Sequence, residues 1–171
     1  PVLDGNLDDP QWQSVPANGF VRLQTGDAPD IPTSVRAIFD DSALYLGYTC
    51  LEKGQESFLA GPPSRDDASL FRADAVEAML QPEDPGAGYV QLAMNPLGGL
   101  FDARYEQPGA QEHWDGKGIE VHGKINADLW TLEVRIPFAA LRETTPTPGD
   151  TWRANFCRNE LPSGELSAWA P

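Results

Sequence analysis

The stretch LWTLEVRIP, Leu129–Pro137, shows the most regular alternation in the chain. Its large apolar side chains fall on every second residue, at Trp130, Leu132, Val134 and Ile136. Successive side chains of a β-strand point to opposite faces of the sheet, so this spacing predicts a strand with one face in the core and one in solvent. The solvent face is expected to carry the residues between them, Thr131, Glu133 and Arg135.

Further strand-like runs surround this segment, and Pro, Gly, Asp and Asn residues that favour turns separate them. SVRAIFDD (34–41) and ALYLGYTC (43–50) alternate on either side of a turn and predict a β-hairpin. ADAVEAML (73–80) is rich in residues that favour helices. We nevertheless expect a strand there, because Pro82 follows closely and YVQLAMNP (89–96) repeats the alternation.

Together these runs predict an all-β fold with little helix, in which PFAALRE (137–143) forms a single helical turn. Further strands are expected in LFDARY (100–105), GIEVHGKI (118–125) and TWRANFCRNE (151–160). Many short strands with regular turns are typical of an antiparallel β-sandwich, a two-sheet architecture of the immunoglobulin or jelly-roll kind. A chain of 171 residues is long enough for one full-sized core, so we expect a single domain over residues 1–171.

The charge of the chain bears on its partners. A net charge of −14 argues against nucleic acid, because such binding needs an excess of Lys and Arg along one face. We expect no membrane insertion, since no run approaches the roughly 20 apolar residues of a membrane span. The first residues lack the basic-then-apolar order of a signal peptide, and we expect the chain to begin inside a domain. Cys50 and Cys157 could form one long-range disulfide or remain two buried thiols.

Seven phrases, taken in order, cover nearly the whole chain: LDGNLDDPQW, VRAIFDDSALYLGYTC, DAVEAML, QLAMNPLGG, WTLEVRIPFAAL, PTPGDTWRANFCRNE and SAWAP. Together they resemble the family 9 carbohydrate-binding modules. The resemblance implies a β-sandwich without catalytic machinery that binds sugars between two aromatic side chains. It also implies attachment to a larger secreted enzyme, and calcium as a structural ion in some members.

The resemblance assigns the two aromatic positions to Phe71 in LFRADAVE and to Trp169 in SAWAP. It assigns the acidic hydrogen-bonding position to Glu77 in DAVE. The sequence departs from the family in that Phe71 replaces an indole, Ala93 replaces an arginine and Cys157 replaces a polar residue. With these three residues changed, the resemblance supports a sugar site in general and does not carry over the family's preference for the ends of glycan chains.

The alternation of three strands leads to the same surface. If Val76 and Val90 lie in the core, the residues next to them point to the other side of the sheet. Applied to the three strands, this places carboxylate and amide groups on one face, at Glu77, Gln91, Asn95, Asn155 and Asn159. Planar polar groups suit sugar hydroxyls, and flat aromatics suit the apolar faces of sugar rings. Polar residues on the outer face of a sheet are otherwise simply solvated.

Asp-rich stretches raise the question of calcium, which takes oxygen ligands from carboxylates and carbonyls in loops. The first place to look is the loop that holds Asp66, Asp67 and Asp74. Turn aspartates also serve the backbone through Asx turns, so metal binding and turn formation both remain open.

Three other functions compete with carbohydrate binding. One is electron transfer by haem b, for which the available axial ligands are Met79, Met94, His113 and His122, without a CxxCH attachment motif. Another is glycoside hydrolysis by a pair of carboxylates. The third is a structural or interaction role without sugar binding. In the favoured interpretation the chain is a monomeric module of a secreted or cell-surface protein, beside other domains of that parent protein.

Overall fold

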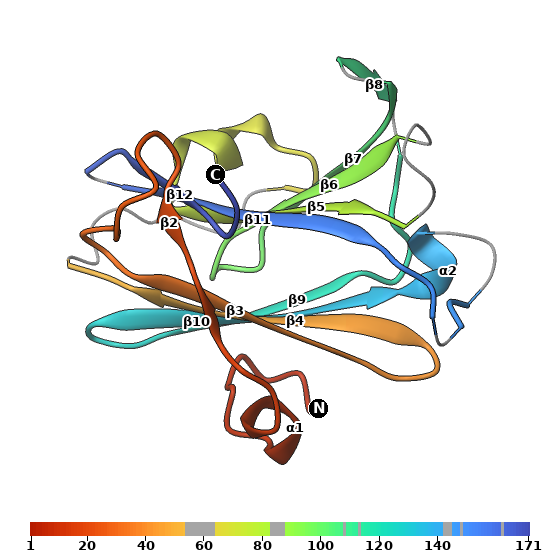
Figure 1. The fold of residues 1–171 in the computed structure, drawn as a ribbon, viewed down its shortest axis with the longest axis horizontal. Coiled ribbons are helices and arrows are strands. Elements are labelled where there is room, and N and C mark those ends of the chain that lie inside the picture. Colours follow the sequence, from red (N-terminus) through yellow and green to blue (C-terminus); the bar gives the residue numbers. More distant parts are fainter. Residues whose placement is uncertain are drawn as a thin grey trace.

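The computed structural model describes residues 1–53, 64–82, 88–107, 109–112, 114–141, 145–147, 149–161 and 163–171. These residues form two antiparallel sheets stacked face to face (Figure 1). This architecture confirms the predicted all-β sandwich. The helices of the described residues are short, namely α1 (Pro10–Gln13), the 3₁₀ helix η2 (Ala68–Arg72) and α2 (Phe138–Leu141). None of these helices has the length and apolar character needed to cross a membrane.

The smaller sheet has five strands in the order β1-β3-β4-β10-β9. Their bounds are β1 (Asn18–Gly19), β3 (Thr33–Phe39), β4 (Ala43–Leu51), β9 (Glu120–Ile125) and β10 (Leu129–Pro137). The hairpin predicted over residues 34–50 is confirmed, because β3 pairs along its whole length with residues 44–50 of β4.

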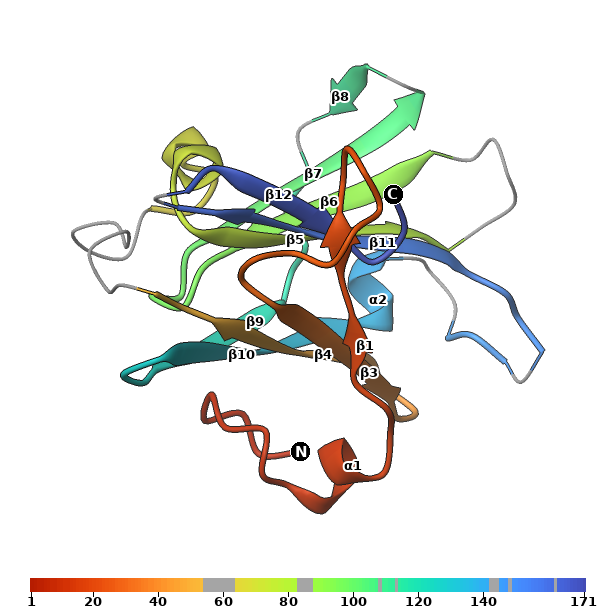
Figure 2. The same cartoon turned by 60° about the vertical axis from the view of Figure 1, so that its left-hand side comes forward.

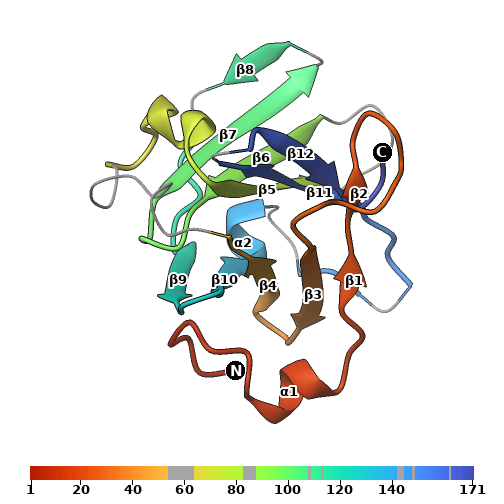
Figure 3. The same ribbon diagram turned by 90° about the vertical axis from the view of Figure 1, so that its left-hand side faces the viewer.

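The larger sheet has seven strands in the order β2-β12-β11-β5-β6-β7-β8. Their bounds are β2 (Val21–Arg22), β5 (Ala75–Gln81), β6 (Tyr89–Met94), β7 (Leu100–Gln107), β8 (Ala110–Glu112), β11 (Arg153–Glu160) and β12 (Glu165–Ala168). The stretch ADAVEAML therefore forms a strand rather than a helix, as expected. Figure 3 shows the two sheets edge-on, with α2 near the gap between them.

Strand β10 lies between β4 and β9 in the smaller sheet. The four apolar side chains that predicted it are fully buried in the core between the sheets, Trp130, Leu132, Val134 and Ile136. The core is completed from the larger sheet by alternate residues of β5 and β6, among them Val76, Ala78, Leu92 and Met94. Period-two alternation therefore identified both walls of the core.

The other face of β10 differs from the prediction, because Glu133 is fully buried rather than solvated. The N-terminal segment with α1 covers this face, as Figure 2 shows. Trp12 Nε1 donates to Glu133 Oε1 at 2.8 Å, and the N–H groups of Asp4 and Gly5 donate to Oε2 at 2.9 Å each. Three donors replace the water that the carboxylate loses, so its burial is tolerated.

A cluster of buried charges joins the two sheets. Arg158 of β11 donates to both oxygens of Asp74, from Nε to Oδ1 at 3.1 Å and from Nη2 to Oδ2 at 2.9 Å. The same guanidinium donates to Glu52 Oε2 at 3.2 Å and to the carbonyl of Leu51 at 2.8 Å. Burial raises the pKa of Glu52 to about 7. Asp74 is thus occupied by an ion pair inside the sandwich.

Candidate functional site

The predicted polar residues point to the outer face, by which we mean the side of the seven-stranded sheet turned away from the five-stranded sheet. On β5, Val76 and Ala78 belong to the core, while Glu77 between them is partly exposed. On β6 and β11 the same alternation turns further side chains outward, among them Gln91, Asn155 and Asn159. The facing of these four residues therefore agrees with the sequence prediction.

The strand register places the outward residues in rows across the sheet. Glu77 of β5 pairs with Cys157 of β11 on one side and with Ala93 of β6 on the other, and Ala93 pairs with Phe101 of β7. In the next row Met79 pairs with Gln91. Glu77 is thus central on the outer face, three strands in from the β2 edge and three from the β8 edge.

Glu77 and Gln91 form one polar unit. Gln91 Nε2 donates to Glu77 Oε2 at 2.6 Å across the diagonal of β5 and β6. Burial raises the pKa of Glu77, and the hydrogen bond from Gln91 opposes that rise. A partly dehydrated carboxylate with an oriented amide beside it makes stronger hydrogen bonds to a ligand than a fully solvated carboxylate does.

Phe71 reaches the outer face from η2, which packs against β6 and β7. Its ring meets the ring of Phe101 edge-on, with centroids 4.9 Å apart and planes at 74°. Asn159 holds this segment in place, because its Nδ2 donates to the carbonyls of Phe71 at 3.2 Å and Ala73 at 3.4 Å. The structure therefore brings Phe71 and Asn159 together, with Asn159 supporting the backbone that carries the aromatic ring.

Trp169 directly follows β12 at the margin of the sheet. Its N–H donates to the carbonyl of Phe156 at 2.8 Å, and its ring lies 5.8 Å from the Phe156 ring at a tilt of 49°. The side chain of Asn155 holds the backbone of Ala170, the residue after Trp169. Its Nδ2 donates to the Ala170 carbonyl at 2.9 Å, and its Oδ1 accepts from the Ala170 N–H at 3.1 Å. Trp169 packs against the core through Phe156, while 44% of its surface stays exposed.

Asn95 takes a different place from the one expected. It follows the last residue of β6 and is only 1% exposed. Its Oδ1 accepts from the N–H groups of Leu97 at 3.1 Å and Gly99 at 2.9 Å. Asn95 therefore shapes the turn into β7, and we do not retain it among the sugar-binding residues.

The two cysteines are both free thiols. Cys50 is buried in the core, whereas Cys157 points to the outer face beside Glu77. Burial raises the pKa of Cys157 to about 11, so the group is a neutral thiol at physiological pH. Of the two alternatives left open by the sequence, the structure has two separate thiols.

The Asp-rich loop contributes one carboxylate to an acidic cluster. Asp66, Asp102 and Asp115 each offer an oxygen within 4.8 Å of the others. Of the two other predicted ligands, Asp67 accepts from the Ser69 N–H at 2.8 Å and caps η2, while Asp74 is paired with Arg158. The structure therefore does not bring the three predicted ligands together: Asp66 lies beside Asp102 and Asp115, which are far away in sequence, while Asp67 and Asp74 have other partners.

Several features of this cluster bear on whether a cation fits. Asp102 is buried, and its Oδ1 has no hydrogen-bond partner among the described residues. Burial raises the pKa of Asp102, and the nearby Asp66 carboxylate adds to the rise. Arg65 Nη2 lies 2.6 Å from Asp102 Oδ2, and Arg65 Nε lies 3.5 Å from Asp115 Oδ1. The oxygen donors suit a hard cation, and one guanidinium already supplies part of the neutralising charge.

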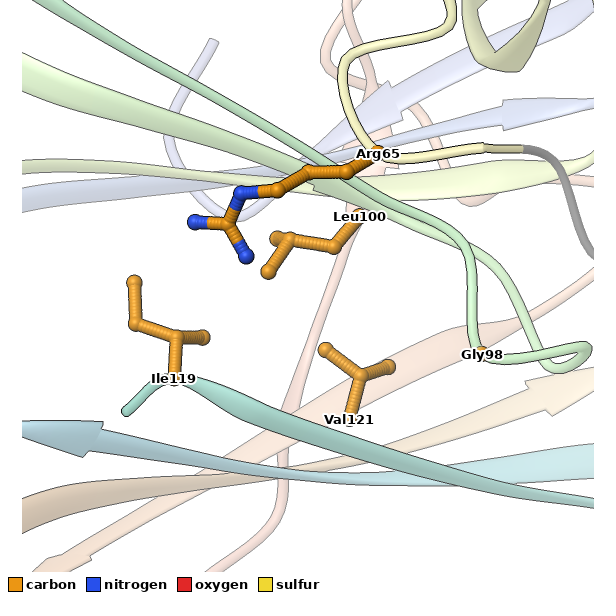
Figure 4. Close-up of a pocket in the computed structure, with 5 residues that line it drawn as sticks. All are labelled: Arg65, Gly98, Leu100, Ile119 and Val121. Carbon is orange, nitrogen blue, oxygen red and sulfur yellow. The ribbon is translucent and has the colours of Figure 1, made fainter. Parts of the chain in front are cut away.

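Arg65 also borders a pocket of about 200 Å³ (Figure 4). The pocket opens between β7 and β9, and Leu100, Ile119, Val121 and Gly98 line it together with Arg65. The pocket lies at the side of the sandwich and is not part of the outer face. The polar groups Glu77 and Gln91 have no part in the pocket.

The residues named for haem ligation do not converge. Met79 points to the outer face, Met94 is buried between the sheets, and His122 lies on β9 with its side chain partly exposed. His113 lies outside the described residues. The described residues therefore provide no pair of these ligands on the two sides of a common cavity.

Comparison with known proteins gives similarity in structure only. No protein-family model matches the chain, and no curated protein matches it significantly in sequence. A family 9 carbohydrate-binding module from Caldicellulosiruptor kristjanssonii, in complex with cellotriose, aligns with a TM-score of 0.69 and 19% identity over 98% of this chain and 77% of that one. Its complex with glucose aligns with the same TM-score and identity, over 79% of that chain.

A candidate carbohydrate-binding protein from Bacteroides uniformis aligns with a TM-score of 0.72 and 15% identity. This alignment covers 93% of the present chain and 78% of the other. Identities this low establish similarity of fold and leave the ligand to be argued from the site. The chain has the fold of the family 9 carbohydrate-binding modules, as the sequence phrases had indicated.

Proposed function

We propose that this chain is a non-catalytic carbohydrate-binding module whose site lies on the outer face of the seven-stranded sheet. The observation that carries the proposal is the Glu77–Gln91 pair, joined at 2.6 Å in the middle of that face. A carboxylate and an amide joined by a hydrogen bond offer acceptors and donors side by side, and sugar hydroxyls can bond to both. The binding of cellotriose and glucose by a module of the same fold supports this proposal.

Aromatic groups near the polar pair suit the apolar side of a sugar ring. Phe101 lies one strand beyond Ala93, in the same row as Glu77, and Phe71 packs against it from η2. Ala93, which stands between Glu77 and Phe101 in this row, is fully buried, so the larger side chains around it form the surface there. We propose stacking on these rings, and on the exposed part of Trp169 at the margin of the sheet.

The charges of the face favour binding over hydrolysis. Glycoside hydrolysis uses two carboxyl groups on either side of the scissile bond. Among the described outward residues of β5, β6, β7 and β11, Glu77 is the one carboxylate. The net charge of −14 argues against an anionic ligand, so the proposed ligand is a glycan without acidic groups.

We also propose that the module serves a larger secreted or cell-surface protein as a monomer, by directing it to a polysaccharide. A domain that binds without turnover has its effect by holding a neighbouring catalytic domain near its substrate, which raises the effective concentration. Size-exclusion chromatography with light scattering checks the oligomeric state.

The test of the function is a glycan array followed by isothermal titration calorimetry on the best glycan. We expect wild type and Asp8→Asn, which removes an exposed carboxylate beyond the opposite sheet, to bind equally well. Glu77→Gln and Gln91→Leu should each weaken binding by about tenfold, the equivalent of 1.4 kcal/mol. Binding of no glycan, a Soret band in the purified protein, or turnover of chromogenic glycosides would each refute the proposal.

We further propose calcium as a structural ion at Asp66, Asp102 and Asp115. The unpartnered Oδ1 of the buried Asp102 supports the fit, since a cation would supply the missing interaction. Such an ion would tie the loop before η2 to β7 and to the segment after β8. It would thereby stabilise the loop that leads into η2, the helix that carries Phe71.

A further inference from the structure

A second aromatic pair lies on the outer face, at the opposite end from Phe71. Tyr89 of β6 and Tyr105 of β7 are cross-strand partners, and their rings stack with centroids 4.8 Å apart and planes at 10°. Both residues are partly exposed. In Figure 1 this end of β6 and β7 lies to the right, away from the η2 end.

The tyrosines stand in line with the proposed sugar site. Tyr89 is two residues from Gln91 along β6, about 7 Å at the rise of a β-strand, and points to the same side. Tyr105 is four residues from Phe101 along β7, about 13 Å. The pKa of Tyr105 is raised by burial, then by Tyr89 and by Glu77, which agrees with a common surface.

Small residues connect the two ends. Between Phe101 and Tyr105 the outward residue of β7 is Ala103, which pairs with Gln91. Ala93 is the outward alanine of β6, in the neighbouring row that contains Glu77 and Phe101. Aromatic rings therefore stand at both ends of a strip along β6 and β7, with Glu77 beside the Phe101 end and Gln91 in the row between Phe101 and Tyr105. Ala93 and Ala103 are fully buried, so the larger side chains around them form the surface of the strip.

We propose that Tyr89 and Tyr105 form a second sugar subsite, so that the outer face binds an extended glycan of at least two sugar units along its length. The proposal rests on the proposed function, and places one unit at Glu77 and Gln91 and a further unit against the Tyr89 ring. Because the strip runs lengthwise along the neighbouring strands β6 and β7, it fits a β-linked chain whose successive rings lie in line. The tyrosine hydroxyls add hydrogen-bond donors at the edge of that unit.

The alternative for such a pair is a purely structural one, since stacked cross-strand aromatics stabilise a sheet. The two roles separate by the dependence of affinity on ligand length. A structural pair affects all ligands alike through folding, whereas a subsite contributes only when a ligand is long enough to reach it.

The experiment titrates the full chain with glucose and cello-oligosaccharides up to six units, and with the matching xylo-oligosaccharides. Wild type should gain at least about fivefold in affinity between the shortest ligand bound and the longer ones. Tyr89→Ala should abolish that gain and keep the affinity for the shortest ligand. Tyr89→Phe, which keeps the ring, and Phe39→Ala, which removes an exposed aromatic from the other sheet, should both retain the gain.

Three results would overturn the subsite while leaving the proposed function standing: affinity independent of length, a length-dependent gain unaffected by Tyr89→Ala, or an equal loss for all lengths. Failure of the proposed function shows itself differently, as no binding of any glycan by wild type. Melting curves of each variant confirm that the folded chain is being compared.

Discussion

Gln91 Nε2 donates to Glu77 Oε2 at 2.6 Å across two adjacent strands of the seven-stranded sheet. The two residues are diagonal neighbours in the register, where long side chains can still meet. The bond holds both planar groups in a fixed orientation before any ligand arrives, which lowers the entropy cost of binding.

Replacing Glu77 by Gln should weaken sugar binding and yet raise thermal stability at neutral pH. Burial raises the pKa of Glu77 above its ordinary value of 4.5, so ionisation of this carboxyl opposes folding. Its contribution to stability is present below pH 4.5 and is lost as the pH rises through the raised pKa.

The melting temperature of Glu77→Gln should therefore exceed that of wild type near pH 7, and the difference should vanish below about pH 4. Differential scanning fluorimetry over that range measures both curves, with Asp8→Asn as the charge control. A melting temperature lower than wild type at pH 7 would contradict the burial cost assigned to Glu77.

Trp169→Ala should lower the affinity for glycan at least about tenfold, because 44% of the residue is exposed and available for stacking. Its contact with Phe156 adds a smaller loss of thermal stability. Trp169→Phe keeps an aromatic ring and should recover part of the affinity. Calorimetry and melting curves together decide the point, since unchanged affinity with a lower melting temperature would make Trp169 a packing residue alone.

Calcium should raise the melting temperature of the wild-type chain over that in a chelator, because an ion that binds only the folded state stabilises it by mass action. At a hundredfold excess over the dissociation constant the gain is about 2.7 kcal/mol. Asp115→Asn, at an exposed position, should remove most of the gain, and Asp102→Asn all of it. Asp67→Asn serves as the control, and equal melting temperatures with and without calcium in wild type would reject the site.

Arg158→Met should destabilise the fold by about 3–5 kcal/mol, since it leaves the buried carboxylates of Asp74 and Glu52 without their cation. Arg153→Met, on the same strand but outward and exposed, should change stability by less than about 0.5 kcal/mol. Urea unfolding of the two variants provides the comparison. A loss below about 1 kcal/mol for Arg158→Met would mean that the buried cluster contributes little.

Local alternation was sufficient to predict which way most site residues face. Within a strand the side-chain period is two, so once Val76 and Val90 are assigned to the core, Glu77 and Gln91 must point outward. The rule failed at Asn95, which lies beyond the last residue of β6. There the chain turns at Pro96, the period no longer applies, and the amide bonds to the turn instead.

Contacts between distant segments were beyond the reach of pattern reasoning. Asp66 pairs through its Oδ1 with the N–H of Asp102 at 3.1 Å, across 36 positions of sequence. Asp115 joins them from yet another loop, and nothing in the spacing of the three residues marks a site. Glu133 was expected in solvent for a similar reason, because the segment that covers it begins more than a hundred residues earlier.

The spacing of apolar side chains along a few neighbouring residues was enough to predict the longer strands β3–β7 and β9–β11, most of their buried faces and the class of fold, whereas the short strands β1, β2, β8 and β12 were not predicted. It also determined the outward facing of Glu77, Gln91, Asn155 and Asn159. Which of those side chains meet one another, and which support a neighbouring backbone, became visible in the folded chain alone. Register between strands and the docking of loops set those distances, and both depend on packing between residues far apart in the chain.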